Sequence, residues 1–298
     1  MSSISIYFQP LDESLFEGLS NESLGAQIDA HNPDGFPDWE NADVITFGVQ
    51  EDRASDTNMG ASGAPNHVRE ELYRLFLGGD LKIADLGNIY QGASISDTYK
   101  ALEDVIFEII KKNKTVLFLG GSRDLGFAAY KAYSKLEQTV NVCSIDPRLN
   151  MGEYSSDVSP NNYINHIILH QPNYLFNYSS IGYQTYLVPP SEIGLMDDLY
   201  FDHHRLGALQ GDIKKTEPLM RYADLVTVNI NAIRFSEIGL ERSDASPNGF
   251  YGEEICQIMR YAGISDKVSC LGLFDYNPVF NESNSSFETI MSGMLAKA

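Results

Sequence analysis

Three segments of the sequence carry polar, chemically active side chains directly after runs of apolar residues. They are VLFLGGSRD at 116–124, NVCSIDPRLN at 141–150 and DLVTVNINAI at 224–233. Aspartate can bind a metal or act as a general base, asparagine offers a neutral carbonyl, and arginine holds anions. If the fold brings these segments together, they are where we expect the chemistry of this chain.

The elements that must position them can be read from the hydrophobic pattern. From residue 43 onward, short apolar runs alternate with longer helical patterns, among them SISDTYKALEDVIFEIIKKN, DLGFAAYKAYSKLEQ, SEIGLMDDLYFDHHRLGAL and YGEEICQIMRYAGI. This alternation predicts an α/β fold, a three-layer α/β/α sandwich on a mainly parallel sheet. Ser94 or Ser96 is expected to cap a helix, and Gly263 is expected to end one. Parallel strands end at one edge of a sheet, so the three segments should meet there.

The length and pattern favour one domain over residues 1–298. We find no internal repeat, and residues 1–40 precede the alternation, so we expect them to form an N-terminal extension. The sequence stops within the helical pattern SFETIMSGMLAKA, which predicts a truncated C-terminal helix.

The composition restricts the partners of the protein. With 21 basic and 41 acidic residues the formal charge is −20, which disfavours binding to nucleic acid or to anionic membranes. No apolar run approaches the roughly 18 residues that a membrane span needs, and the first residues lack a basic, apolar leader. We therefore expect a cytoplasmic protein. Its three cysteines, Cys143, Cys256 and Cys270, are widely spaced and predict reduced thiols.

The three polar segments resemble the metal-binding motifs of the arginase, agmatinase and formimidoylglutamase family of ureohydrolases. In that family Gly-Gly-x-His, Asp-Ala-His-x-Asp and Asp-x-Asp together hold two manganese ions that share a hydroxide. Two further segments are similar: GAPNHVRE at 63–70 to an N-terminal Gly-Pro-x-x-x-Arg segment, and residues 246–278 to the C-terminal section of the formimidoylglutamase branch. The resemblance covers roughly residues 40–298. It implies an arginase-like fold and, for an intact site, hydrolysis of linear amidine C–N bonds.

Only one of the six metal-ligand positions keeps the residue type that the resemblance implies. Asp146 is retained, whereas two histidines and three aspartates are replaced by Arg123, Arg148, Asn150, Asn229 and Asn231. Arginine has no lone pair to donate and stays protonated. At an effective dielectric of about 20, a guanidinium about 4 Å from a dication costs on the order of 8 kcal/mol. We therefore expect no metal, no other cofactor and no confidently assigned catalytic residue.

Three interpretations remain for these vestigial metal-site positions. In the first, Arg123 and Arg148 pair with Asp146, and also with Asp124 or Asp275, in a structural ion network. In the second, the two arginines and one aspartate leave a net positive pocket that binds an anionic small molecule. In the third, Asp146 acts as a general base without a metal.

Asp275 has two interpretations of its own. It stands where the family's Glu-x-Asn-Pro glutamate contacts the substrate, which makes it a possible substrate-pocket residue. It could equally cap a strand end beside Asn277 and Pro278.

Other candidates carry a weaker signal. His203 and His204 are expected as neighbours on a helix and cannot chelate one ion together. His166 and His170 have the i, i+4 spacing of half a zinc site but lack a third ligand. The tyrosine-rich stretch at 173–186 is either an exposed partner surface or, as we favour, packing beneath a loop.

The sequence therefore predicts a pseudoenzyme of the arginase-like fold that has lost its manganese and its activity. Its expected role is binding or assembly, with an anionic small molecule or a protein as partner. The family often forms trimers or hexamers, so the resemblance also implies a homo-oligomer. The alternative is an active formimidoylglutamase-like hydrolase.

Overall fold

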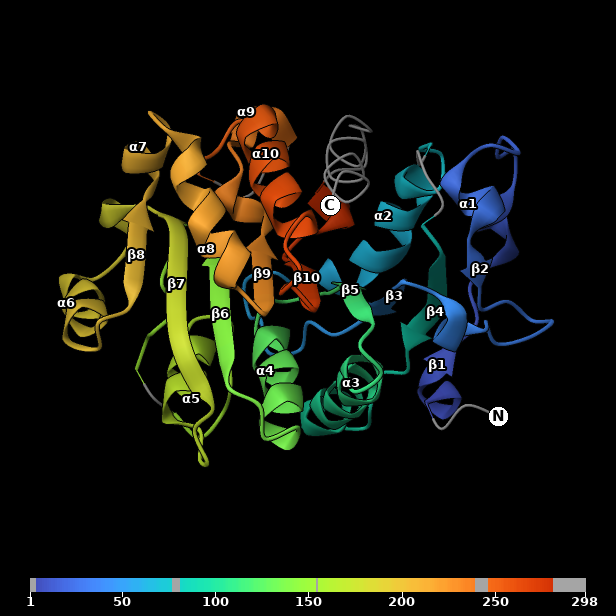
Figure 1. The fold of residues 1–298 in the computed structure, drawn as a ribbon, viewed down its shortest axis with the longest axis horizontal. Coiled ribbons are helices and arrows are strands. Elements are labelled where there is room, and N and C mark those ends of the chain that lie inside the picture. Colours follow the sequence, from blue (N-terminus) through green and yellow to red (C-terminus); the bar gives the residue numbers. More distant parts are fainter. Residues whose placement is uncertain (1–3, 77–80, 154, 239–245, 281–298) are drawn as a thin grey trace.

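The protein is described by a computed structural model over residues 4–76, 81–153, 155–238 and 246–280, in which one sheet lies between two layers of helices (Figure 1). The strands are β1 Phe8–Gln9, β2 Asp29–Ala30, β3 Val44–Val49, β4 Ile83–Ile89, β5 Thr115–Leu119, β6 Val140–Ile145, β7 Leu175–Tyr183, β8 Asp202–Arg205, β9 Leu225–Asn229 and β10 Cys270–Phe274. The α-helices are α1 Leu24–Gln27, α2 Ala64–Leu72, α3 Ile95–Ile110, α4 Leu125–Lys135, α5 Tyr163–Leu169, α6 Pro190–Asp198, α7 Leu206–Leu209, α8 Glu217–Tyr222, α9 Phe235–Ile238 and α10 Gly252–Gly263.

The order of the strands determines which loops become neighbours. It is β1-β4-β3-β5-β10-β9-β6-β7-β8, with β2 also paired to β4. The pairing of β1 with β4 is antiparallel, and the other pairings are parallel. The three polar segments include the carboxyl ends of β5, β6 and β9, and β10 lies between β5 and β9. The predicted α/β/α architecture is confirmed, and it brings those segments to the middle of one edge.

Apolar packing covers both faces of the sheet. One core joins the sheet to α3, α4 and α5, and the other joins it to α2, α7, α8 and α10 (Figure 1). Within β6, Val140 and Val142 belong to the first core, and Cys143 and Ile145 belong to the second. Burial on both faces is why the strands appear in the sequence as continuous apolar runs.

The helix ends follow the predicted signals. Ser94, rather than Ser96, caps α3: its hydroxyl accepts from the Asp97 backbone N–H at 3.2 Å, and Asp97 accepts from the Ser94 backbone N–H at 2.8 Å. This reciprocal capping box satisfies two amide groups that the helix leaves unpaired. The last residue of α10 is Gly263, as expected.

The single helix expected around His203 and His204 is wrong. Tyr200 adopts a left-handed conformation with φ of 57° just after α6, and Asp202–Arg205 then pairs with β7 as the edge strand β8. The sequence did not indicate β7 as a strand either, because its buried centre includes polar residues, Ser179 and Ser180. Long-range pairing has overridden the local helical pattern.

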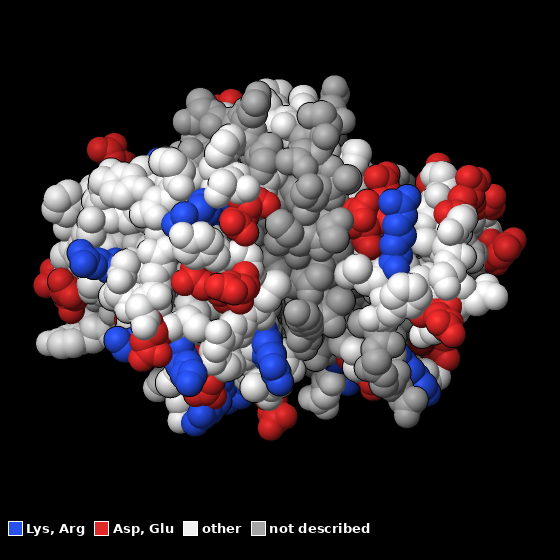
Figure 2. Space-filling model, turned by 90° about the horizontal axis from the view of Figure 1, so that it is seen from above, with Lys and Arg blue, Asp and Glu red and all other residues white. Residues whose placement is uncertain are grey.

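Several sequence expectations concern the chain as a whole. Cys143 and Cys270 are buried free thiols, Cys256 is half-buried, and burial raises the pKa of the two buried thiols. Within the described ranges no helix is long and apolar enough to cross a membrane. The face in Figure 2 carries acidic and basic side chains interspersed, not gathered into a basic surface. The expected C-terminal helix lies outside the described residues.

Candidate functional site

Four neighbouring strands deliver the site residues to the carboxyl edge of the sheet. Arg123 lies in the turn between β5 and α4, and Asp146 and Asn150 follow β6. Asn229 ends β9, and Asp275 follows β10. Because β5, β10, β9 and β6 are adjacent in the sheet, residues up to 152 positions apart in sequence come into contact.

The Arg123 guanidinium is the centre of this cluster. Its Nη1 donates to Asp275 Oδ2 at 2.5 Å, and its Nε lies 3.8 Å from Asp146 Oδ2. Burial by itself lowers the pKa of Arg123, but the charges of Asp275 and Asp146 raise it above its ordinary value. The arginine is therefore a fixed cation between two carboxylates. Its remaining contacts are to Asn150 Oδ1 at 3.2 Å, Pro160 O at 2.9 Å and Asn161 Oδ1 at 3.1 Å.

Asp146 is almost completely buried and accepts three hydrogen bonds. Its Oδ1 accepts from the Arg148 backbone N–H at 2.8 Å, and its Oδ2 accepts from the side-chain amides of Asn150 at 3.0 Å and Asn229 at 2.8 Å. Burial raises the pKa of Asp146, and Arg123 and these donors oppose the rise. Asn150 and Asn229, at two positions where the resemblance implies metal ligands, thus act as donors toward Asp146.

The side chain of Arg148 leaves the cluster. Its Nη1 donates to the Leu187 carbonyl at 2.9 Å, and among the described residues the guanidinium forms no ion pair with Asp146. The expected pairing of Arg123 is present, but that of Arg148 with Asp146 is wrong. The reason is local: the backbone N–H of Arg148 already binds Asp146, and the side chain extends toward the loop before α6.

Asn231, the last of the six positions, lies in the turn after β9. Its backbone N–H donates to Asn229 Oδ1 at 2.9 Å. Its own Oδ1 is buried and has no hydrogen-bond partner within the described part of the chain. The side chains of Arg123, Asn150 and Asn229 therefore lie against Asp146, Asn231 contacts Asn229, and the Arg148 side chain turns away.

Asp275 is held by its backbone in an uncommon conformation. Its φ is 68°, its N–H donates to the Gly121 carbonyl at 2.8 Å, and its carbonyl accepts from Asn58 Nδ2 at 3.1 Å. Such left-handed geometry is costly for a residue other than glycine and needs this support. Gly121 is itself required, since a Cβ there would lie 2.0 Å from the Glu51 carbonyl oxygen. The result is a carboxylate directed at Arg123.

Asp124 belongs to a separate network, so it is not the partner of Arg123. Its carboxylate accepts from the Ser122 and Tyr99 hydroxyls. Burial raises the pKa of Asp124 to about 6, against the effect of these two hydrogen bonds. Arg123 and Asp124 are adjacent in sequence, but their side chains belong to different hydrogen-bond networks.

Several members of the network carried no signal in the sequence. Asn58 reaches the Asp275 loop from 217 positions away, and Asn161 and Pro160 contact Arg123 from an irregular loop. Only the strand order shows that these loops meet.

The histidine pairs take structural positions. His170 Nε2 lies 3.2 Å from the Ser134 hydroxyl, and Phe127 packs against both His166 and His170. His203 contacts Asp197 at 2.9 Å from the edge strand. Among the residues that the structure describes, no group of three or more His, Cys, Asp or Glu side chains is arranged to hold a metal ion.

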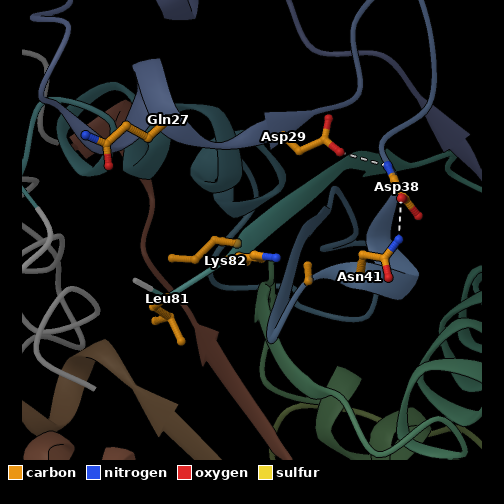
Figure 3. A pocket seen from close by; sticks show the side chains of 8 residues that line it. Gln27, Asp29, Asp38, Asn41, Leu81 and Lys82 are labelled. Atoms are coloured by element: carbon orange, nitrogen blue, oxygen red, sulfur yellow. Dashed lines mark hydrogen bonds between the residues drawn. The ribbon is translucent and has the colours of Figure 1, made fainter. Parts of the chain in front are cut away.

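A surface hollow of about 640 Å³ lies at the opposite edge, by the first residues of β3 and β4 (Figure 3). Its acidic side chains are engaged locally: Asp29 accepts from the Asp38 backbone N–H at 2.8 Å, and Asp38 accepts from Asn41 Nδ2 at 2.6 Å. Lys82 and Leu81 line the hollow as well. The hollow is therefore separate from the Arg123 cluster.

Comparisons with known proteins give a family match in sequence. Residues 42–187 match the sequence model of the arginase family. No curated protein matches the sequence.

Solved structures share the fold at low identity. Formiminoglutamase of Trypanosoma cruzi with Mn²⁺ superposes with a TM-score of 0.79 at 17% identity, over 92% of this chain and 97% of that one. Formimidoylglutamase of Bacillus subtilis gives 0.78 at 14% identity, over 94% and 91%. Agmatine ureohydrolase of Thermoplasma volcanium gives 0.73 at 16% identity, over 96% of both chains. Residues 42–187 thus match the arginase, or ureohydrolase, family, and the chain as a whole has the arginase-like fold.

Proposed function

We propose that this arginase-family protein has lost the dinuclear manganese site and the hydrolase activity, and is retained as a binding or assembly protein. One observation carries the proposal. The Arg123 guanidinium, at a position where the resemblance implies a metal-binding histidine, lies 2.5 Å from Asp275 and 3.8 Å from Asp146. The positive charge between these carboxylates belongs to the chain itself.

The donor set around Arg123 does not fit two manganese ions. Paired divalent ions need several carboxylates to bind them and to offset their repulsion. Here the cluster has two carboxylates, and Asp146 Oδ2 already accepts from the amides of Asn150 and Asn229. An amide nitrogen is not a metal ligand, and an arginine cannot become one. Metal binding would require these bonds to break and Arg123 to withdraw.

A binding role would involve Arg148 rather than Arg123. One positive and two negative charges leave Arg123, Asp146 and Asp275 with a net charge of −1, which repels an anion. Arg148 is only partly buried, and its guanidinium has one hydrogen bond to the described residues. An anionic small molecule, the ligand class expected from the sequence, would therefore bind at Arg148. If the role is assembly, the same proposal predicts that the chain binds a protein partner or forms a homo-oligomer.

The test is metal content together with activity. Purified protein is incubated with excess MnCl₂, desalted and analysed by elemental mass spectrometry, and release of formamide, urea or ammonia is assayed with formimidoylglutamate, arginine and agmatine. We expect manganese far below one ion per chain and no turnover. A content near two ions per chain, as paired-metal hydrolases hold, together with chelator-sensitive turnover, would establish the active hydrolase instead.

A restored variant provides the positive control for that test. It carries Arg123→His, Arg148→His, Asn150→Asp, Asn229→Asp and Asn231→Asp, which rebuild the family's ligand types at the five exchanged positions. We expect this variant to bind manganese under conditions in which the natural chain does not. Equal manganese content in the two proteins would show that these positions do not determine metal binding.

A further inference from the structure

A row of buried hydroxyl groups lies one step below the Asp146–Asn229 contact. Thr227, Ser144 and Ser180 are register neighbours on β9, β6 and β7. Ser144 precedes Asp146 by two residues and Thr227 precedes Asn229 by two, so the row and that contact share the face of the sheet covered by α4 and α5. Each of the three residues is at most 1% exposed.

Two tyrosines add their hydroxyls to this row. Tyr163 on α5 brings its Oη to 3.4 Å from Ser144 Oγ, and Tyr178 lies on β7 two residues before Ser180. Burial and the nearby charge of Asp146 raise the pKa of Tyr163 to about 12, and the Ser144 and Thr227 hydroxyls oppose that rise. Burial raises the pKa of Tyr178 as well, with Ser144 again opposing. The five hydroxyls therefore lie within one small region, which we call the hydroxyl cluster.

Three of these five groups lack a well-aligned partner in the described chain. Tyr178 Oη, Ser180 Oγ and Thr227 Oγ1 are buried and have no described partner at good hydrogen-bond geometry, although Thr227 lies near the Tyr163 hydroxyl and Ser144 lies near that of Tyr178. A buried hydroxyl left unpaired costs about 1–3 kcal/mol, and adjacent polar groups beyond direct reach of each other are where a bridging molecule binds. Three such groups side by side therefore indicate a ligand.

We propose that the hydroxyl cluster binds one or more ordered internal water molecules. The balance of donors and acceptors selects water, because each hydroxyl has a proton to donate and lone pairs to offer, and water accepts and donates up to four hydrogen bonds. A monovalent cation would use the lone pairs and leave the hydroxyl protons without acceptors. An anion would lie directly beneath the charge of Asp146.

The bound water joins the three strands just below their carboxyl ends. It links β9, β6 and β7 through side chains, and it supports the positions from which Asn229 and Asp146 extend. This role does not depend on whether the site above binds metal, so the proposal stands apart from the proposed loss of manganese.

The test combines a high-resolution crystal structure with thermal unfolding. In the natural protein we expect density bonded to at least three cluster hydroxyls at about 2.7–3.2 Å. Thr227→Val should remove a bond to this water and lower the Tm by about 2–4 °C, and Tyr178→Phe should act in the same direction.

The matched control is Thr46→Val, on β3 and the opposite face of the sheet. Its hydroxyl is also buried without a partner among the described residues, so its removal should leave the Tm unchanged or raise it. Absence of density in the natural protein would overturn the proposal, as would a Thr227→Val variant at least as stable as the natural chain. So would metal-like distances of about 2.4 Å together with a Tm that depends on the choice of sodium or potassium.

Discussion

Two buried arginine–aspartate networks contact the sheet, one around Arg69 and one around Arg123. They differ in how completely the arginine is paired. Arg69 on α2 is fully buried, and its Nε and Nη2 each bond one oxygen of Asp85 at 2.8 Å. Asn88 Oδ1 accepts from its Nη1, the Gly87 carbonyl accepts from Nη2 as well, and the Tyr73 hydroxyl donates to Asp85. These partners lie within 19 residues of Arg69 in sequence, and together they form a closed, two-pronged ion pair.

The Arg123 network is assembled differently. Arg123 makes one short bond to Asp275, 152 residues away, and fills its other directions with amide and carbonyl oxygens from the loop at 150–161. Its side chain is 11% exposed, whereas that of Arg69 is 0% exposed. The comparison indicates that Arg69 serves the stability of the fold, while Arg123 occupies a position between carboxylates that another cation could take.

Replacing Arg69 should have the largest effect on stability. Arg69→Met leaves the Asp85 carboxylate buried without its charged partner, which typically costs about 3–5 kcal/mol. Urea unfolding followed by circular dichroism should show this loss. Arg69→Met with Asp85→Asn is the control, since removing both charges should recover part of the stability. A single variant within about 1 kcal/mol of the natural chain would break the comparison.

The sequence predicted the architecture well because its signals are local. Apolar runs, the Ser94 cap and the Gly263 helix end depend on neighbouring residues, and each appears in the structure. β7 and β8 were missed because their strand character comes from pairing with each other and with β6. Their polar residues resemble a helix or a loop until that pairing is known.

The candidate site was predicted in part. The three segments do meet at the carboxyl edge, since parallel strands guarantee a shared edge. The direction of each side chain is not determined by that rule. Arg123 turns to Asp275 and Asp146, whereas Arg148 turns to Leu187, and no spacing in the sequence separates the two outcomes.

Asp124 sharpens the comparison because it is a buried carboxylate held by hydroxyls instead of an arginine. Burial raises the pKa of Asp124 to about 6, above its ordinary value of 3.8, so the folded state binds a proton more readily than the unfolded state. Stability should therefore fall as the pH rises from about 4 to about 6, by about 3 kcal/mol.

The variant Asp124→Asn should remove that part of the pH dependence. Urea midpoints at several pH values between about 4 and 7 measure it, and the difference between variant and natural chain isolates Asp124 from Asp146, whose pKa is raised as well. Parallel curves for the two proteins would show that Asp124 does not titrate in this range.

Replacing Arg123 tests whether an added cation can take its position. Arg123→Met should cost about 1–3 kcal/mol, less than the loss at Arg69, because Asp146 keeps three hydrogen-bond donors and the position is partly exposed. Added Mn²⁺ should then bind between Asp146 and Asp275 and restore about 1.4 kcal/mol at ten times its Kd.

The readout is the Tm with and without millimolar MnCl₂, for Arg123→Met and for Arg69→Met as the matched control. Only the Arg123 variant should gain stability, because the closed pair around Asp85 leaves no route for a hydrated ion. If both variants respond equally, the two networks do not differ in how easily an added ion reaches their carboxylates.

The smallest effect is expected at Arg221, and it separates geometry from burial. Arg221 forms the same two-pronged bond as Arg69, with Nε and Nη2 at 2.9 and 2.8 Å from the two oxygens of Glu217, but its side chain is 60% exposed on α8. In water the attraction is screened and two long side chains must be ordered, so Arg221→Ala should shift the Tm by about 1 °C or less, and not at all in 1 M NaCl. A shift as large as that of Arg69→Met would mean that the two-pronged bond stabilises an arginine pair whatever its burial. The expected contrast would show that this bond is critical only where water cannot replace it. Arg69 is fully shielded from water, whereas Arg123 is shielded only in part.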